Sequence, residues 1–466
     1  MNTKGKLGLG ILISLVVGNM VGSGIFMLPR SLAEVASPAG VILAWLLTGF
    51  GVLVTALVFG NLAIRKPKLT GGPQIYAKKL FKRGSKKSTL SGFMSTWGYW
   101  IGNLAGNVAI ITTFAGYLST FFPILTSEAA LFHVGSFTLY VGNALTFLVC
   151  TILLWGTHWI ILNGLENAGK LNILATSAKV IGFMLFIIIA LFAFETSNIL
   201  PFAEPKVNAA GHSVDLFGQI NSAAITTLWA FIGVESAVVF ASRAKKQSDV
   251  KKATIIGLLI ALAIYIGIST LVMGILSQNE LIASQKPLID AIEAVLGPIA
   301  GKILAAIGLI SLFGSTIGWI MLSAEVPYAA AKQGIFIPAF LKENKKGIPT
   351  FSLVVTNILG QLFIFSTVSR SISQAFDFII YIATLSYLVP YLISSIFQLK
   401  LVISGETYTS MKSRRVDFAI GIIATIYSIW VIIAGTADIK TFSFGVLLLL
   451  SGILFYNQLN KGSKPE

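Results

Sequence analysis

The chain has few of the side chains on which enzymes depend. Its 466 residues include one cysteine, Cys150, and three widely separated histidines, His133, His158 and His212. A single cysteine cannot form a disulfide within the chain or build a thiolate metal site. No nucleophile paired with a base, no cluster of metal ligands and no nucleotide-binding motif is present in the sequence. We therefore expect no enzyme activity, no bound metal and no cofactor.

Charge is also scarce, and acids are the scarcer sign. Only 11% of the residues are charged, with 18 Asp and Glu against 34 Lys and Arg, which gives a formal net charge of +16. A nucleic-acid-binding protein would gather this excess on one folded surface. Here the basic residues recur in clusters between apolar segments. This pattern argues against nucleic acid as a partner.

Long apolar segments are abundant. Hydrophobic residues make up 55% of the chain, and the mean hydropathy is +0.84. Successive apolar segments of about 20 residues predict transmembrane helices. We expect twelve of them, at residues 7–36, 39–64, 91–122, 138–156, 170–194, 219–241, 253–278, 301–330, 350–368, 373–399, 416–436 and 441–460. The predicted fold is therefore an all-α integral membrane protein in which residues 1–466 form a single domain.

The basic residues also assign an orientation to these segments. With the N-terminus inside, 27 of the 34 Lys and Arg fall in cytoplasmic segments and only five in outer loops. This alternation is the positive-inside rule applied across twelve crossings. It predicts a multi-pass protein of the cell membrane with both termini in the cytoplasm and the lipid bilayer as its surroundings.

Glycines interrupt the first apolar segment. Gly18, Gly22 and Gly24 fall within seven positions, with Ser23 between the last two, and glycine is a poor helix former. A broken helix in a bilayer is tolerated only where the break is buried in protein or lines a cavity. The interruption therefore predicts a binding site at the membrane midplane. The alternative is close helix packing, because Gly18 and Gly22 also form a small-xxx-small pattern.

The sixth apolar segment carries a second glycine together with a carboxylate. Gly233 and Glu235 lie within residues 227–237, deep in the segment. Lys179 lies near the middle of the fifth segment, about nine residues from either end. Ionisable groups inside a membrane segment are costly and are functional hypotheses by default. Asn103 in the third segment and Trp319 in the eighth could either line a cavity or pack between helices.

The two interruptions imply an internal repeat. They fall in the first and the sixth segments, so the spacing predicts a five-plus-five repeat. The first repeat spans about residues 7–194 and the second about 219–399, and two extra helices follow at about 416–460.

These motifs resemble those of the amino acid–polyamine–organocation transporters, and within them the basic amino acid/polyamine antiporters. Residues 22–26, Gly-Ser-Gly-Ile-Phe, are similar to the family's first-span motif, and residues 229–235, Trp-Ala-Phe-Ile-Gly-Val-Glu, to its sixth-span motif. Residues 241–254 look most like the arginine/ornithine antiporter branch. Gly98, Tyr99, Gly106 and Ala383 depart from the arginine/agmatine exchanger, so agmatine is not the expected substrate.

The resemblance implies a LeuT-like inverted-repeat fold with broken first and sixth helices. It also implies roles for individual residues. The substrate carboxylate would bind backbone N–H groups of Ser23, Gly24 and Ile25, next to Gly22, at a helix N-terminus. The ammonium would meet carbonyls at the ends of the broken helices. The side-chain residues follow the same analogy. Trp229 would close over the substrate, and Ile232 lies in the same motif. Trp319 would stack on a cationic side chain and stabilise it by ~2 kcal/mol, and Asn103 would bind the end of that side chain. Lys179 would replace a sodium ion, and Glu235 would be a gate.

The implied function is a secondary transporter of small-molecule amino acids. It would exchange arginine for ornithine, and because both carry one positive charge the exchange would be electroneutral. One alternative is a proton-coupled importer in which Glu235 or Lys179 titrates. Others are an exchanger of lysine, histidine or tyrosine for its amine, and a sensor that binds without transport. The resemblance leaves open whether the chain forms a homodimer.

Overall fold

The computed structural model describes residues 8–22, 24–67, 69, 72, 74–82, 84–135, 137–163, 165–207, 211–239 and 244–459. The chain is predominantly helical. Its helices are α1 (Leu9–Met20), α2 (Gly24–Val35), α3 (Pro38–Arg65), α4 (Gln74–Leu80), α5 (Lys86–Leu118), α6 (Val141–Asn163), α7 (Leu165–Phe192), α8 (Leu216–Ala230), α9 (Ser236–Val239), α10 (Gln247–Ile275), α11 (Gln278–Ala283), α12 (Pro287–Leu296), α13 (Pro298–Lys332), α14 (Thr350–Ile364), α15 (Ser366–Ser369), α16 (Ile372–Ser404), α17 (Met411–Ala434) and α18 (Ile439–Tyr456). Single 3-10 turns lie at η1 (Pro123–Thr126), η2 (Thr196–Ile199), η4 (Pro338–Leu341) and η5 (Gly435–Ala437).

Nine helices in the described part of the chain are long and apolar enough to cross a membrane. They are α3, α5, α6, α10, α13, α14 continued by α15, α16, α17 and α18. The predicted segments missing from this set are the first, the fifth and the sixth. The first and sixth are each divided into shorter helices, and of the fifth only residues Ile181–Phe192 qualify, as a shorter apolar helix. The number of twelve crossings therefore stays a prediction.

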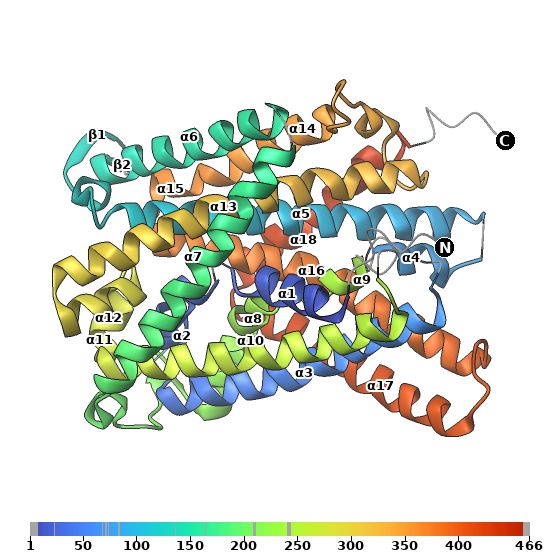
Figure 1. Cartoon of the computed structure of the whole chain (residues 1–466), viewed down its shortest axis with the longest axis horizontal. Helices are drawn as coiled ribbons and strands as arrows, with labels where there is room; N and C mark the ends of the chain where they lie inside the picture. The colour runs from blue at the N-terminus through green and yellow to red at the C-terminus, as the bar shows by residue number, and fades with distance from the viewer. Residues whose placement is uncertain are drawn as a thin grey trace.

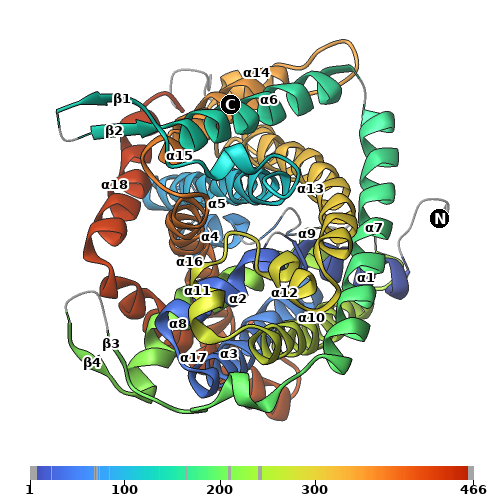
Figure 2. The same cartoon turned by 90° about the vertical axis from the view of Figure 1, so that its left-hand side faces the viewer.

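The helices run side by side and form a central group inside a peripheral ring (Figures 1 and 2). Helix α5 packs against α16 and α13, and 89% of its most apolar stretch is buried. Helix α18 lies at the edge of the molecule in Figure 2, and only 11% of its apolar stretch is buried. Residues 20–22 and 231–235, at the two interruptions, are buried in protein, as the physics of a bilayer requires.

Two small β-hairpins interrupt the otherwise helical chain. Strand β1 (Ala130–Val134) pairs antiparallel with β2 (Phe137–Tyr140), with Val134 opposite Phe137, and β3 (Lys206–Val207) pairs with β4 (Ser213–Val214). Both hairpins and the short helices α11 and α12 lie at the end of the molecule that faces the viewer in Figure 2. The expectation of an entirely helical chain missed these hairpins because they are too short and too exposed to produce a periodic apolar pattern.

Local sequence sets where several helices begin. At α3 the Ser37 hydroxyl accepts a hydrogen bond from the Gly40 N–H, 3.4 Å apart, and Pro38 occupies the first turn, where a missing N–H costs nothing. At α16 Ser371 and Gln374 form a reciprocal capping box. These caps lie just outside the long apolar runs and supply partners for N–H groups that the helix leaves unpaired.

A buried carboxylate anchors α17 to the rest of the bundle. Asp417 is 6% exposed. Its oxygens accept hydrogen bonds from the Asn61 amide at 2.9 Å, the Arg65 guanidinium at 2.8 Å and the Tyr408 hydroxyl at 2.9 Å. Its backbone carbonyl accepts from the Gln398 amide at 2.7 Å. The network joins the ends of α3, α16 and α17 that lie opposite the hairpins, and it satisfies the carboxylate that burial would otherwise penalise.

Candidate functional site

The first apolar segment leaves the helical conformation where its glycines cluster. Helix α1 ends at Met20, the Gly22 N–H donates back to the Met20 carbonyl at 2.7 Å, and α2 starts at Gly24. Ser23 lies outside the described residues. Gly24 and Ile25 are buried in the first turn of α2, where helix geometry leaves N–H groups without internal partners. The break therefore places the C-terminal end of α1, with its unpaired carbonyls, beside the N-terminal end of α2, with its unpaired N–H groups.

The sixth segment breaks in the same way. Helix α8 ends at Ala230, and the chain turns through Gly233 before α9 begins at Ser236. Gly233 has a φ of +107°, and a Cβ there would lie 3.1–3.2 Å from the backbone and Cβ of Asn19. A side chain is therefore excluded on two grounds, backbone conformation and space. The Asn19 amide donates to the Ser236 hydroxyl at 2.7 Å, which joins the two breaks directly.

One tyrosine holds the C-terminal ends of both half-helices. The Tyr265 hydroxyl, on α10, lies 2.7 Å from the Met20 carbonyl oxygen and 2.6 Å from the Ala230 carbonyl oxygen. Tyr265 is fully buried and stacks against Trp45 with ring centroids 5.0 Å apart. A phenol has a single proton, so two converging carbonyls share one donor. This arrangement leaves spare acceptor capacity at the point where the two helices end.

A small cavity lies between the breaks. It encloses about 10 Å³, which is about the space for one water. Its walls come from both interruptions and two indoles: Asn19, Met20, Gly22, Gly24, Ile110, Trp229, Ala230, Ile232 and Trp319. A second cavity of about 20 Å³ lies beyond it, and Asn19 and Trp319 line both. The site is closed in this conformation, with Trp319 as the wall between two chambers.

Gly106 makes room for the two indoles. A Cβ on Gly106 would lie 2.9 Å from Cη2 of Trp229 and 3.4 Å from Cζ3 of Trp319. Trp229 also covers Gly24, where a Cβ would lie 3.4 Å from the indole Nε1. The two rings therefore converge above the first turn of α2, supported from α5 by a residue that has no side chain. The predicted Trp229, Ile232, Trp319, Gly22 and Gly24 meet at one place.

Glu235 is the centre of a buried hydrogen-bond network. It is 2% exposed. Its carboxylate accepts hydrogen bonds from the Tyr99 hydroxyl at 2.9 Å, the Tyr391 hydroxyl at 2.6 Å and the Gly233 N–H at 3.1 Å. Tyr99 belongs to α5 and Tyr391 to α16. The carboxylate thus ties two long helices to the second break, and Glu235 lines the second cavity.

The structure places two other predicted residues near the breaks but outside the first cavity. The Lys179 ammonium lies 3.5 Å from the Gly18 carbonyl of α1, which is longer than an ordinary hydrogen bond. Asn103 donates to the Tyr99 carbonyl of its own helix at 2.6 Å. Its buried Oδ1 has no hydrogen-bond partner among the described residues. Neither side chain is among the lining residues of the two cavities.

An ion pair that sequence reasoning did not single out joins α2 to α16. Arg30 on α2 is 6% exposed. It binds Asp377 on α16 and Glu34 at 2.8 Å, and its Nε donates to the Ile282 carbonyl at 3.2 Å. Ser31 also donates to Asp377. Charged residues inside predicted spans were the available signal, but the pairing of Arg30 with Asp377 is visible only in the folded chain.

Comparison with known proteins identifies relatives along the whole chain. A family model described as amino acid permease matches residues 7–456. A Bacillus subtilis protein named "Putative arginine/ornithine antiporter" is 51% identical over 97% of this chain and 96% of its own length. Proteins named arginine/ornithine antiporter from Pseudomonas aeruginosa and Latilactobacillus sakei are 36% and 32% identical, over 99% and 98% of this chain and 92% and 91% of their own lengths.

Proposed function

The chain belongs to the amino acid permease family, and we propose that it exchanges arginine for ornithine across the cell membrane by alternating access. The observation that carries this proposal is the convergence of both helix breaks on one cavity closed by Trp229 and Trp319. The names of the relatives supply the substrate pair. Arginine and ornithine carry the same charge, so one-for-one exchange moves no net charge and is unaffected by membrane potential.

The breaks offer complementary charges for an amino acid backbone. The first turn of α2, at Gly24 and Ile25, presents N–H groups and the positive end of a helix dipole to the carboxylate. The carbonyls of Met20 and Ala230 present the negative ends of α1 and α8 to the ammonium. Neither group requires a charged side chain. This part of the site recognises features common to all α-amino acids.

The two indoles are the side-chain part of the proposed site. An amino acid cannot fit in a cavity of about 10 Å³, so Trp229 and Trp319 must move apart to admit it. Once they close again, the face of Trp319 can stabilise a guanidinium or ammonium by ~2 kcal/mol in a desolvated setting. Asn103 lies one turn from Gly106 on α5. Its amide oxygen has no partner among the described residues, so it can accept a hydrogen bond from the end of an extended cationic chain.

The polar networks on either side of the cavity act as gates in this proposal. The Arg30–Asp377 pair bridges α2 and α16 on the outer side, and the Glu235 network bridges α9, α5 and α16 on the inner side. Lys179 places a fixed positive charge beside α1, which removes the need for a sodium ion there. Opening either gate requires breaking buried hydrogen bonds, which ligand binding between the breaks would compensate.

The proposed mechanism assumes the inverted-repeat architecture. In it residues 7–194 and 219–399 form two repeats of five helices, residues 416–460 add two more, and both termini face the cytoplasm. The division of α1 from α2 and of α8 from α9 supports this assignment, because discontinuous helices at corresponding positions of two halves are the hallmark of such transporters.

Exchange in proteoliposomes tests the proposed function. Vesicles loaded with ornithine should take up radiolabelled arginine rapidly, and empty vesicles should not. The initial rate should be the same with and without an imposed membrane potential. An inner panel of lysine, histidine, tyrosine and agmatine should support less uptake than ornithine.

Two results would reject arginine/ornithine exchange. Equal uptake into empty and loaded vesicles would show that no counter-substrate is needed. Accumulation driven by an inward proton gradient alone would show a proton-coupled importer, in which Lys179 or Glu235 carries the proton. Saturable binding of arginine without flux under either condition would identify a sensor instead.

Enlarging Gly106 should impair exchange by crowding the indoles. Gly106→Ala places a methyl group 2.9 Å from Trp229, so the rigid ring must shift. Overpacking of this kind costs about 1–3 kcal/mol, which corresponds to about a 5- to 150-fold loss of initial exchange rate. Gly106→Val should lose nearly all exchange. Initial rates normalised to folded protein measure the effect.

Gly267 provides the matched control. It lies within α10, and a Cβ there would meet nothing within 4 Å. Gly267→Ala should therefore leave exchange unchanged and slightly favour the helix. If Gly106→Ala behaves like Gly267→Ala, Gly106 does not hold the indoles in the positions that transport requires.

A further inference from the structure

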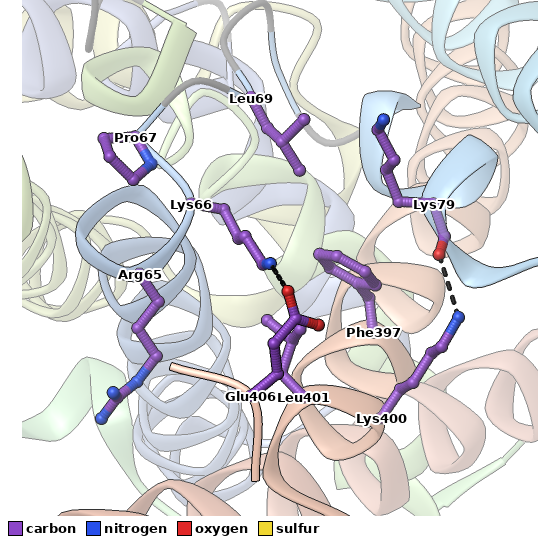
Figure 3. Close-up of a pocket in the computed structure, with 9 residues that line it drawn as sticks. All are labelled: Arg65, Lys66, Pro67, Leu69, Lys79, Phe397, Lys400, Leu401 and Glu406. Atoms are coloured by element: carbon purple, nitrogen blue, oxygen red, sulfur yellow. Dashed lines mark hydrogen bonds and ion pairs between the residues drawn. The ribbon is translucent and has the colours of Figure 1, made fainter. Parts of the chain in front are cut away.

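A cleft with a basic rim lies where α3, α4 and α16 end (Figure 3). It shares no lining residue with the two cavities at the helix breaks. This basic cleft has a volume of about 470 Å³, within the range of small-molecule sites. Its lining residues are Arg65, Lys66, Pro67, Leu69, Lys79, Phe397, Lys400, Leu401 and Glu406. None of these residues takes part in the amino acid site.

The rim of the basic cleft holds more positive charge than its neighbours neutralise. The ammonium groups of Lys66, Lys79 and Lys400 come from the end of α3, from α4 and from α16. Among the described residues, the carboxylate that lines the cleft belongs to Glu406. Glu406 forms an ion pair with Lys66. The charge of Arg65 is already matched by Asp417, with an N–O distance of 2.7 Å. The ammonium groups of Lys79 and Lys400 therefore have no lining counter-anion among the described residues.

Lys400 connects the two walls of the cleft. Its ammonium donates to the carbonyl oxygens of Lys79, at 3.1 Å, and Leu80, at 2.6 Å, which are the last residues of α4. This contact caps the negative end of a short helix. Carbonyl acceptors carry no formal charge, so Lys400 keeps its full positive charge. An anion in the cleft would meet it beside Lys66, which follows the last residue of α3, and Lys79 from α4.

The ion pair of Lys66 with Glu406 shows how an anion could enter. The Glu406 side chain is 59% exposed and follows Gly405, the residue that ends α16. Exposed pairs contribute little free energy, typically 0–1 kcal/mol. Figure 3 shows the Glu406 carboxylate reaching across the cleft to Lys66. A ligand anion can therefore replace the carboxylate at small cost.

The floor of the cleft is apolar. Phe397 and Leu401 on α16 are 3% and 2% exposed, and Tyr76 of α4 stacks on Phe397 with ring centroids 5.6 Å apart. The predicted orientation places these helix ends at the cytoplasmic membrane surface. An apolar floor below a cationic rim at that depth matches the polarity of an acidic phospholipid, with its phosphate above its acyl chains.

We propose that the basic cleft binds a phosphate-bearing anion, as presented by an acidic phospholipid headgroup, and that this anion clamps α4 to α3 and α16. The phosphate lies between Lys66, Lys79 and Lys400 and takes the place of Glu406. Because α4 packs against both α5 and α16, the bound anion stabilises the arrangement of helix ends at this face. The site is independent of which amino acids the protein transports.

Binding can be measured on the purified full chain without any transport assay. In phosphate-free detergent solution, short-chain phosphatidylglycerol should raise the Tm in a saturable manner, and short-chain phosphatidylcholine should not. A second titration with inorganic phosphate separates the sources. A rise with phosphatidylglycerol alone identifies a lipid, and a rise with both shows that the phosphate group suffices.

Paired variants separate binding from a change in stability. Lys66→Gln and Glu406→Gln break the same ion pair, but they should change the apparent Kd for phosphatidylglycerol in opposite directions. Lys66→Gln combined with Lys79→Gln should weaken binding at least tenfold, because two cations are lost. Glu406→Gln should strengthen it, because the competing carboxylate is gone. Lys412→Gln, at an exposed lysine outside the cleft, should have no effect.

The proposal is overturned if neither phosphatidylglycerol nor phosphate raises the Tm. It is equally overturned if Lys412→Gln weakens binding as much as the double variant, since the effect would then be general surface charge. A Glu406→Gln variant that binds more weakly would show that the carboxylate supports the cleft and is not displaced by the anion.

Discussion

Replacing Glu235 with alanine should reduce arginine/ornithine exchange by about 30-fold or more. The substitution leaves the hydroxyls of Tyr99 and Tyr391 and the Gly233 N–H without their shared acceptor. Each buried donor without a partner costs about 1–3 kcal/mol. Two donors at about 1 kcal/mol each cost about 2 kcal/mol, which corresponds to about a 30-fold loss because 1.4 kcal/mol is a factor of ten. Glu235→Gln keeps one acceptor oxygen and should lose less.

The loss arises because the carboxylate hydrogen-bonds to α5, α16 and the second break at one point. Under the proposed function this network is the inner gate, so we expect the inner side of the site to close poorly around a substrate without it. Exchange rates should therefore fall more than equilibrium binding of arginine, measured by calorimetry in detergent. This difference separates a gate from a substrate-binding residue.

Single removal of the tyrosine hydroxyls tests the same network from its other ends. Tyr99→Phe and Tyr391→Phe should each reduce exchange less than Glu235→Ala does. Combined with Glu235→Ala, each should add less than its own single effect, because the acceptor of its hydroxyl is already missing. Tyr117 supplies the control. It is buried on α5, and its hydroxyl has no hydrogen-bond partner among the described residues, so Tyr117→Phe should preserve exchange. Fully additive losses would refute a shared network.

Removing the hydroxyl of Tyr265 should raise the KM for arginine by about 5- to 150-fold. Tyr265→Phe keeps the ring, which packs against Trp45 and Phe231, but leaves the Met20 and Ala230 carbonyls without their shared donor. The Met20 carbonyl keeps the Gly22 N–H as a donor, so the buried acceptor left unsatisfied is the Ala230 carbonyl, at a cost of about 1–3 kcal/mol. The two half-helix ends are then no longer held in one relative position, and the ammonium meets carbonyls that are less well oriented.

Comparing the change in KM with the change in the maximal exchange rate tests whether Tyr265 positions the half-helix ends for binding. A positioning role for Tyr265 acts on binding, so KM should change more than the maximal rate, and calorimetric affinity for ornithine should fall in parallel. Tyr117→Phe again provides a matched loss of one buried phenol hydroxyl. Equal kinetics for the two variants would show that the bridge from Tyr265 to the half-helices is structural only.

Much of the site was predictable because it depends on residues that break helices or tolerate a membrane poorly. Gly22, Gly24 and Gly233 weaken helices wherever they stand, and the chain indeed leaves the helical conformation at both places. Glu235 and Lys179 are conspicuous because a bilayer penalises them. Trp229, Ile232 and Trp319 followed from family motifs and meet at the cavity. Asn103 does not reach it in this conformation, and Ser23 lies outside the described residues.

The partners of these groups were not predictable. Tyr99 and Tyr391 lie 136 and 156 residues from Glu235 along the chain, and a tyrosine in an apolar segment looks the same whether it packs or donates a hydrogen bond. Tyr265 gave no signal at all, although it links both breaks. The same holds for the pairing of Arg30 with Asp377, which are 347 residues apart.

The amino-acid sequence by itself determined the membrane class, the positions of the two helix breaks and the presence of buried charges. These properties follow from local composition, because hydropathy and glycine content act on each segment separately. Only the tertiary structure decided which hydroxyls satisfy Glu235, which tyrosine fixes the half-helix ends and how closely Gly106 lets the indoles approach. Those features depend on distances between segments that pack together from opposite ends of the chain, and local sequence does not encode such distances.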